Sequence, residues 1–199
     1  MGTLRQHGGL SGFLKMTESP YDHFGAGHAG TAISAAVGYA LARDVAAHRH
    51  RAVAIVGDAG IANGMSWEAL NHAGEARTDV TVVLNDNRMS IAPNVGALTN
   101  YLAKLRSEPR FQHLARVAKT VVEKLPEPLA RTAAGLRHGI THQLAPEETG
   151  TIFEEIGWEY IGPVDGHDLP TLLDVFRNVR ELDGPVFVHA ITVKGKGYE

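Results

Sequence analysis

The stretch RAVAIVGDAGIANGMSWEALNHAGEARTDVTVVLNDN, residues 51–87, decides the fold of this chain. The segments 51–56 and 79–84 supply the runs AVAIV and VTVVL, which are typical of buried strands in a parallel sheet. Residues 66–75, between these runs, predict a helix with Ser66 as its N-cap. Strand, helix and strand in this order predict a βαβ unit, whose crossover is nearly always right-handed.

The alternation of helices and strands continues on both sides of this unit. Upstream, residues 31–48 are rich in alanine and carry an apolar stripe at helical spacing, which predicts a helix. Asp165 and Asp168 are expected to cap a later helix. Alternating elements predict an α/β fold, a doubly wound and mostly parallel sheet with helices on both faces. The downstream elements predicted are a helix at 147–156, a strand at 158–161, a turn at 162–168, a helix at 169–182 and a strand at 186–192.

The whole chain, 1–199, is expected to form a single domain with two unusual parts. Residues 1–27 are rich in glycine and show little periodic pattern, which predicts an irregular lead-in. From 98 to 145 the sequence becomes polar and amphipathic and is interrupted by prolines. That part is expected to be a helical insertion, an excursion from the sheet.

The composition is ordinary for a soluble globular protein, with 44% hydrophobic and 21% charged residues. A net charge of -3 at pH 7 gives no general attraction to nucleic acid or to an anionic membrane, so neither is expected as a partner. The lack of cysteine excludes disulfides and thiolate metal sites and fits a reducing compartment, so we expect a cytoplasmic protein. No apolar run approaches the roughly 18 residues of a membrane span.

Oxygen-bearing side chains follow both strands of the βαβ unit. Asp58 comes directly after the first strand, and Asn85, Asp86 and Asn87 follow the second. The carboxyl ends of parallel strands meet at one edge of the sheet, so these groups are expected to lie together. A carboxylate, an amide carbonyl and water suit Mg²⁺, which completes its octahedron with phosphate oxygens. A purely structural turn at Asp58 is the alternative.

Glycines around this acid give the turn a second expected use. Gly57, Gly60 and Gly64 let backbone N–H groups approach a diphosphate closely. The start of the following helix favours the negative charge of that group. The pattern therefore predicts a site for a diphosphate and Mg²⁺ at this edge of the sheet.

Six stretches, spread over nearly the whole chain, resemble the 1-deoxy-D-xylulose-5-phosphate synthase family and follow its order. They are TLRQHGGLSGF, FGAGHAGTAIS, VGDAGIANGMSWEALNHAG, LNDNRMSIAPNVGALTNYL, EEIGWEYIGPVDGHDLPTLL and VKGKGYE. The resemblance implies a thiamine-diphosphate-binding fold and a transketolase-like transferase that uses thiamine diphosphate and Mg²⁺. It also implies that pyruvate loses carbon dioxide and that its two-carbon remainder joins glyceraldehyde 3-phosphate, a step toward isoprenoids, thiamine and pyridoxal.

The resemblance also implies the roles of individual residues. Asp58, the side chain of Asn87 and the backbone carbonyl of Met89 match the Mg²⁺ ligands of the family. His28 is carried over as a candidate catalytic residue. The positions implied to contact the cofactor are Gly27, His28, Ala29, Asp58, Ala59, Gly60, Asn87, Ile91, Lys194 and Tyr198.

The chain departs from the family at the site and in its extent. Ala59 stands where the general Gly-Asp-Gly signature of thiamine-diphosphate enzymes has its second glycine, and family members usually carry serine at Ala29 and Gly30. The family has three domains, and the resemblance covers the greater part of the first. It therefore implies that 1–199 is a single truncated domain that binds the diphosphate and Mg²⁺. It implies that a pyrimidine-binding domain, with the glutamate that activates the cofactor, is needed in cis or as a separate subunit. The chain alone is expected to be inactive or nearly so, and a homodimer is expected.

Two alternative functions stay open. One is a subunit of a split transketolase-like enzyme, whose partner carries the missing glutamate and restores activity. The other is a non-catalytic remnant that binds the cofactor, favoured by the alanines at Ala29 and Ala59. The remnant predicts no activity with any partner.

Overall fold

The computed structural model describes residues 2–89, 95–107 and 151–198. Within these ranges, four strands lie in the order β1-β2-β4-β3, and every neighbouring pair is parallel. The sheet confirms the predicted α/β fold. The strands are β1 (Val53–Gly57), β2 (Thr81–Asp86), β3 (Glu159–Asp165) and β4 (Val186–Ile191).

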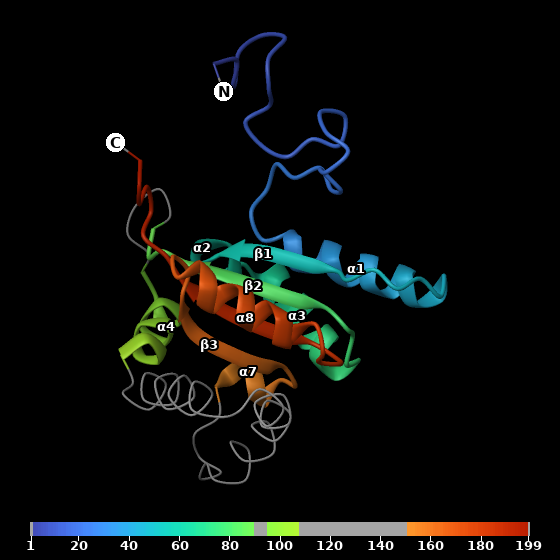
Figure 1. Cartoon of the computed structure of the whole chain (residues 1–199), viewed down its shortest axis with the longest axis vertical. Coiled ribbons are helices and arrows are strands. Elements are labelled where there is room, and N and C mark those ends of the chain that lie inside the picture. Colours follow the sequence, from blue (N-terminus) through green and yellow to red (C-terminus); the bar gives the residue numbers. More distant parts are fainter. Residues whose placement is uncertain (1, 90–94, 108–150, 199) are drawn as a thin grey trace.

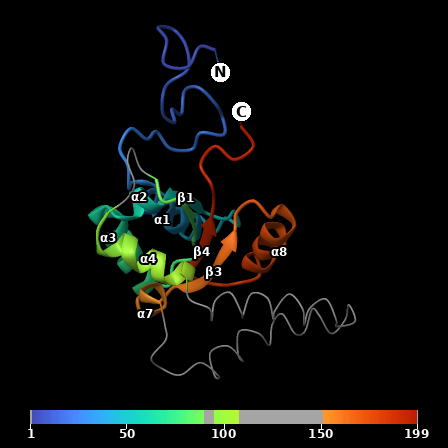
Figure 2. The ribbon, with the colours of Figure 1, turned by 90° about the vertical axis from the view of Figure 1, so that its left-hand side faces the viewer.

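Helices cover both faces of the sheet, but unequally. The helices are α1 (Ala32–Val45), α2 (Asp58–Ile61), α3 (Gly64–Glu75), α4 (Ala97–Ser107), α7 (Ile152–Glu155) and α8 (Leu169–Val179). Figure 2 shows α8 on one side of the sheet and α3, α4 and α7 on the other. On the α8 side, Ile55 of the edge strand β1 is 71% exposed, because α8 packs over β3.

The larger core lies between the sheet and the helices opposite α8. Phe153 of α7 stacks on Phe187 of β4, with ring centroids 3.9 Å apart, and Trp158 meets the same ring edge-on. Trp158 also donates from Nε1 to the Leu70 carbonyl of α3, at 2.8 Å. Large aromatic side chains contribute much of the energy of a core, so these contacts fasten α7 and β3 to the βαβ unit.

The turn before α8 behaves largely as predicted. Asp168 is the N-cap of α8, because its side chain accepts from the Thr171 N–H at 3.3 Å and from the Thr171 hydroxyl at 2.6 Å. Asp165 does not cap the helix, since its Oδ1 accepts the His167 N–H at 2.9 Å inside the turn. His167 Nε2 accepts the Val193 N–H at 2.8 Å and so ties this turn to the segment after β4.

Two local predictions are wrong. Ser66 is the third residue of α3, and the N-cap is Asn63, so the helix begins earlier than its apolar pattern indicates. β3 continues to Asp165, through residues where a turn was expected. Gly162 there has a φ of +136°, and a Cβ on it would lie 2.7 Å from the His189 carbonyl oxygen. Gly162 thus permits an irregularity within the edge strand β3, and glycine and proline at this point are the reason that the sequence predicts a turn.

Two segments of the chain are predicted to lie outside the sheet, the lead-in before α1 and the helical insertion after β2. Residues 2–30 form turns without a helix or strand and extend away from the sheet (Figure 1). α4 starts the predicted helical insertion, whose remainder at 108–145 lies outside the described residues, as do residues 147–150 of the helix predicted before β3. No helix in the described ranges is long and apolar enough to cross a membrane.

Candidate functional site

The carboxyl ends of β1 and β2 bring two acidic side chains together. Gly57 pairs with Asn85 in the sheet, so Asp58 and Asp86 follow side by side. Asp58 is 7% exposed and Asp86 is fully buried. The two side chains lie close enough to interact directly.

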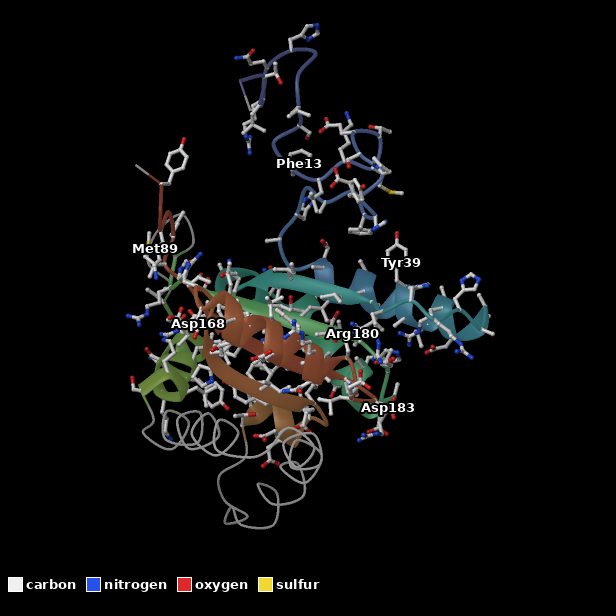
Figure 3. The ribbon with its side chains drawn as sticks, in the orientation of Figure 1. Phe13, Tyr39, Met89, Asp168, Arg180 and Asp183 are labelled. Atoms are coloured by element: carbon white, nitrogen blue, oxygen red, sulfur yellow. The ribbon has the colours of Figure 1, made fainter. Side chains whose placement is uncertain are left out.

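Figure 3 places Met89 and Asp168 at this end of the sheet, with Arg180 and Asp183 at the opposite end. The acidic pair therefore lies at the edge where parallel strands present their carboxyl ends, which is where ligands of open α/β sheets bind.

Asp58 is held in surroundings that disfavour its charge. Burial raises the pKa of Asp58, and the neighbouring charge of Asp86 raises it further. Backbone N–H groups of Ala59 and Arg88 offset part of this effect, and the Ala59 N–H lies 3.1 Å from Oδ1 of Asp58. Negative charge at Asp58 is thus only partly compensated, a condition that favours a bound cation.

Asp86 is held by a chain of buried polar groups. His189 of β4 donates from Nε2 to Asp86 Oδ2 at 2.9 Å, and Arg106 of α4 donates to the same oxygen. Burial by itself would raise the pKa of Asp86, but the hydrogen bond from His189 and the charge of Arg106 outweigh it and hold the pKa below its usual range. The Tyr160 hydroxyl of β3 lies 2.8 Å from His189 Nδ1. Asp86 Oδ1 has no hydrogen-bond partner among the described residues.

A tight turn after β2 presents Asn87 and Met89. Asn87 Oδ1 accepts the Met89 N–H at 2.9 Å, and Arg88 between them has a φ of +63°. Both residues line a cavity of about 520 Å³, whose other walls are Arg88 and residues 191–194 after β4. Lys194 therefore lies on the same cavity as Asn87.

The loop that precedes α1 lies against the turn between α2 and α3. Gly30 has a φ of +85°, and a Cβ on it would lie 2.7 Å from the Asn63 side chain, so a larger residue here would strain the backbone and displace Asn63. The Asn63 amide donates to the Gly60 carbonyl at 3.1 Å. The buried hydroxyl of Ser66 lies 2.9 Å from the Gly60 carbonyl and 3.3 Å from the Gly30 carbonyl. Ser66 thus joins the two loops instead of capping the helix.

Ser66→Ala is expected to lower the free energy of unfolding by about 1–2 kcal/mol, because two carbonyl groups lose their shared buried donor. Urea unfolding measures this loss. Ser34→Ala, at an exposed position of α1, is the matched control and should change stability by less than about 0.5 kcal/mol. Equal stabilities of the two variants would contradict the bridging role.

Most of the predicted site residues lie at this edge of the sheet. Those at the ends of β1 and β2 are Asp58, Ala59, Gly60, Asn87 and Met89. The loop of Gly27, His28 and Ala29 precedes Gly30, which contacts the turn between α2 and α3. Their roles in binding stay predictions.

The remaining predicted residues are placed differently. Lys194 lines the cavity beside Asn87. Tyr198 is 90% exposed and does not line it. Ile91 lies outside the described residues.

Sequence reasoning missed the residues that support the site. His189 and Arg106 contact Asp86 from 103 and 20 positions away, and the contacts of Ser66 differ from those of the predicted helix cap. One signal was available for His189, a polar residue inside the apolar strand PVFVHAI. Its partner could not be identified without the strand order.

Comparison with known proteins gives a family and a fold. The profile of the family described as 1-deoxy-D-xylulose-5-phosphate synthase matches residues 1–192. The 1-deoxy-D-xylulose-5-phosphate synthase of Syntrophomonas wolfei is 48% identical over 202 residues, which cover 100% of this chain and 31% of the relative. That of Thermomicrobium roseum is 50% identical over 198 residues, covering 99% of this chain and 31% of the relative. The chain thus spans about a third of the length of these curated relatives.

Solved structures support the fold. Transketolase from Leishmania mexicana matches with a TM-score of 0.62 and 18% identity, covering 95% of this chain and 23% of that one. Transketolase from Campylobacter jejuni matches with a TM-score of 0.56 and 19% identity, covering 88% of this chain and 22% of that one. At such identities, the likeness concerns the fold alone.

Proposed function

The chain belongs to the 1-deoxy-D-xylulose-5-phosphate synthase family, and from this premise we propose that it forms the part of the enzyme that binds a cation and the diphosphate of the cofactor. Membership of the family implies a thiamine-diphosphate-dependent transferase of the transketolase type. The proposal adds Mg²⁺ as the cation and assigns residues to it.

One observation carries the proposal: two neighbouring carboxylates, Asp58 and Asp86, are buried at the strand ends, and Oδ1 of Asp86 lacks a hydrogen-bond partner in the described ranges. A buried oxygen without a donor and an acid whose charge is only partly compensated both favour positive charge nearby. The oxygens of Asp58 and Asn87 and the carbonyl of Met89 are hard ligands, which suit Mg²⁺. The residues present therefore fit this cation.

The proposed roles follow from position. Asp58, Asn87 and the Met89 carbonyl hold Mg²⁺, while the backbone at Ala59 and Gly60 lies beside the diphosphate. The loop of Gly27, His28 and Ala29, together with Ile91, Lys194 and Tyr198, borders the cofactor, and His28 is the candidate catalytic residue. Thiamine diphosphate, when bound, supplies stabilisation of a carbanion. The residues of this chain contribute binding and orientation.

The complete enzyme is proposed to release carbon dioxide from pyruvate and to join the two-carbon unit to glyceraldehyde 3-phosphate. For this it needs the pyrimidine-binding domain, in cis or on a separate subunit, and it is proposed to act as a homodimer in the cytoplasm. The isolated chain is proposed to be inactive or nearly so. Ala59 and Ala29 are the departures that keep a non-catalytic remnant as a second candidate.

The first test is a calorimetric titration of the chain with thiamine diphosphate, once with Mg²⁺ and once with EDTA. We expect binding that requires the divalent cation, because both the diphosphate and Asp58 are negative and need a shared counter-charge. Equal affinity in EDTA would contradict the proposed cation site. Absence of binding in both buffers would contradict the proposed function.

A second measurement separates the enzyme from the remnant. The chain is mixed with the parts of the Thermomicrobium roseum relative that lie outside the matched 31%, and carbon dioxide release from pyruvate is followed. Release that appears only in the mixture supports the enzyme. A stable complex without release would favour the remnant.

A further inference from the structure

A continuous chain of buried polar groups crosses the sheet next to the proposed cation site. It joins Arg106 of α4, Asp86 of β2, His189 of β4 and Tyr160 of β3. The side chains of Asp86 and His189 are fully buried, and that of Arg106 is 9% exposed. The four groups come from four separate elements, so no local turn or helix cap accounts for them.

The hydrogen bonds of Asp86 are divided unevenly between its oxygens. Oδ2 accepts from both His189 and Arg106, with His189 Nε2 at 2.9 Å. Oδ1 is buried and has no partner in the part of the chain that the structure describes. A buried acceptor without a donor is unfavourable, because water has been removed and nothing has replaced it. Two donors on one oxygen fix the carboxylate and leave the other oxygen available.

The position of this carboxylate links it to the proposed site. Asp58 lies beside Asp86 at the ends of adjacent strands, and the two side chains interact directly. Two carboxylates in contact repel each other unless positive charge lies near both. Asn87 follows Asp86 directly, so the strand end that presents the amide also presents the fixed carboxylate.

Tyr160, at the other end of this row of hydrogen-bonded groups, fixes the imidazole of His189. A carboxylate only accepts, so His189 Nε2 carries the proton that Asp86 Oδ2 receives. Burial raises the pKa of Tyr160, so its hydroxyl keeps its proton and can donate to His189 Nδ1. The phenol thereby sets the tautomer and the orientation of the ring.

We propose that Asp86 is a positioning residue for the cation that Asp58 and Asn87 hold: fixed by Arg106 and His189, it adds negative charge just outside the ligand set. This inference rests on the proposed function, because it requires a cation at Asp58. His189 and Tyr160 act through Asp86. Groups that surround the ligands of a metal orient those ligands and tune the affinity.

A role in folding alone makes a different prediction. Breaking a buried ion pair lowers stability wherever the pair lies. If Asp86 acted in folding alone, replacing it would leave the affinity for a metal unchanged at temperatures where the variant is folded. Metal affinity and thermal unfolding, measured on the same variants, therefore separate the two roles.

The test is a titration of the chain with Mn²⁺ alone, with free Mn²⁺ followed by electron paramagnetic resonance. Asp86→Asn keeps the shape of the side chain, and we expect it to bind Mn²⁺ about 10- to 100-fold more weakly than the parent. Thr151→Ala is the matched control, because it removes the capping box of α7 and lowers stability away from the site. Its affinity for Mn²⁺ should equal that of the parent.

Each outcome has a definite meaning. If Asp86→Asn binds Mn²⁺ like the parent while Asp58→Asn has lost binding, the inference is overturned and the proposed function stands. If the parent shows no binding that depends on Asp58, both are overturned. If Asp86→Asn does not fold, Tyr160→Phe decides, because it removes only the hydroxyl on His189. Weaker Mn²⁺ binding by this folded variant supports the inference, and unchanged binding overturns it.

Discussion

Replacing Gly74 by alanine is expected to lower the free energy of unfolding by about 3 kcal/mol or more. Gly74 lies inside α3, where alanine is normally better than glycine by about 1 kcal/mol. Here a Cβ would lie 1.8 Å from the Ile156 carbonyl oxygen and 3.3 Å from Cδ1 of Trp158. The first neighbour is backbone and the second is a buried core residue, so neither can move aside at low cost. α3 and the end of α7 therefore touch backbone to backbone.

Urea unfolding followed by circular dichroism measures this effect. Gly38→Ala is the matched control, because Gly38 lies inside α1 and a Cβ on it would meet nothing within 4 Å. The free energy of unfolding of that variant is expected to rise by up to about 1 kcal/mol. The two glycines are alike in secondary structure and differ in what surrounds them. Equal gains at both positions would show that α3 and α7 do not pack in this way.

The pair of glycines also shows where the sequence stops being informative. Continuous apolar runs predicted β1 and β2, and helical spacing predicted α1, because these patterns depend on residues close together in the chain. Gly74 and Gly38 look the same at that level, as glycines inside helical patterns. The difference arises from Ile156, which is 82 positions away from Gly74, and no local pattern contains it.

The candidate site divides in the same way. Asp58 and Asn87 could be predicted together, because the end of a parallel strand fixes where the next residue lies. The partners of Asp86 could not, since Arg106 and His189 reach it only through the packing of α4 and the order of β2 and β4. The contacts that hold Asp86 therefore depend on tertiary structure and have no local sequence pattern.

Replacing Asp58 by asparagine is expected to weaken cation-dependent binding of thiamine diphosphate by about 100-fold or more, because the proposed charged ligand of the cation is lost. The same change should make the metal-free chain more stable. The pKa of Asp58 is raised in the folded state by burial and by the charge of Asp86, so the ionised form of Asp58 opposes folding at neutral pH. Asparagine has the same shape and removes that charge.

The two expected effects have opposite signs, and this makes the test selective. Calorimetry measures the loss of binding, and urea unfolding measures the gain in stability at neutral pH. For the parent without metal, stability should rise as the pH falls through the raised pKa of Asp58, and Asp58→Asn should lack that rise. Asp174→Asn, which removes an exposed carboxylate on α8, is the control and should change neither property appreciably. A variant that binds less because it is misfolded would also be less stable, so lost binding with gained stability can come only from the missing charge at the strand end.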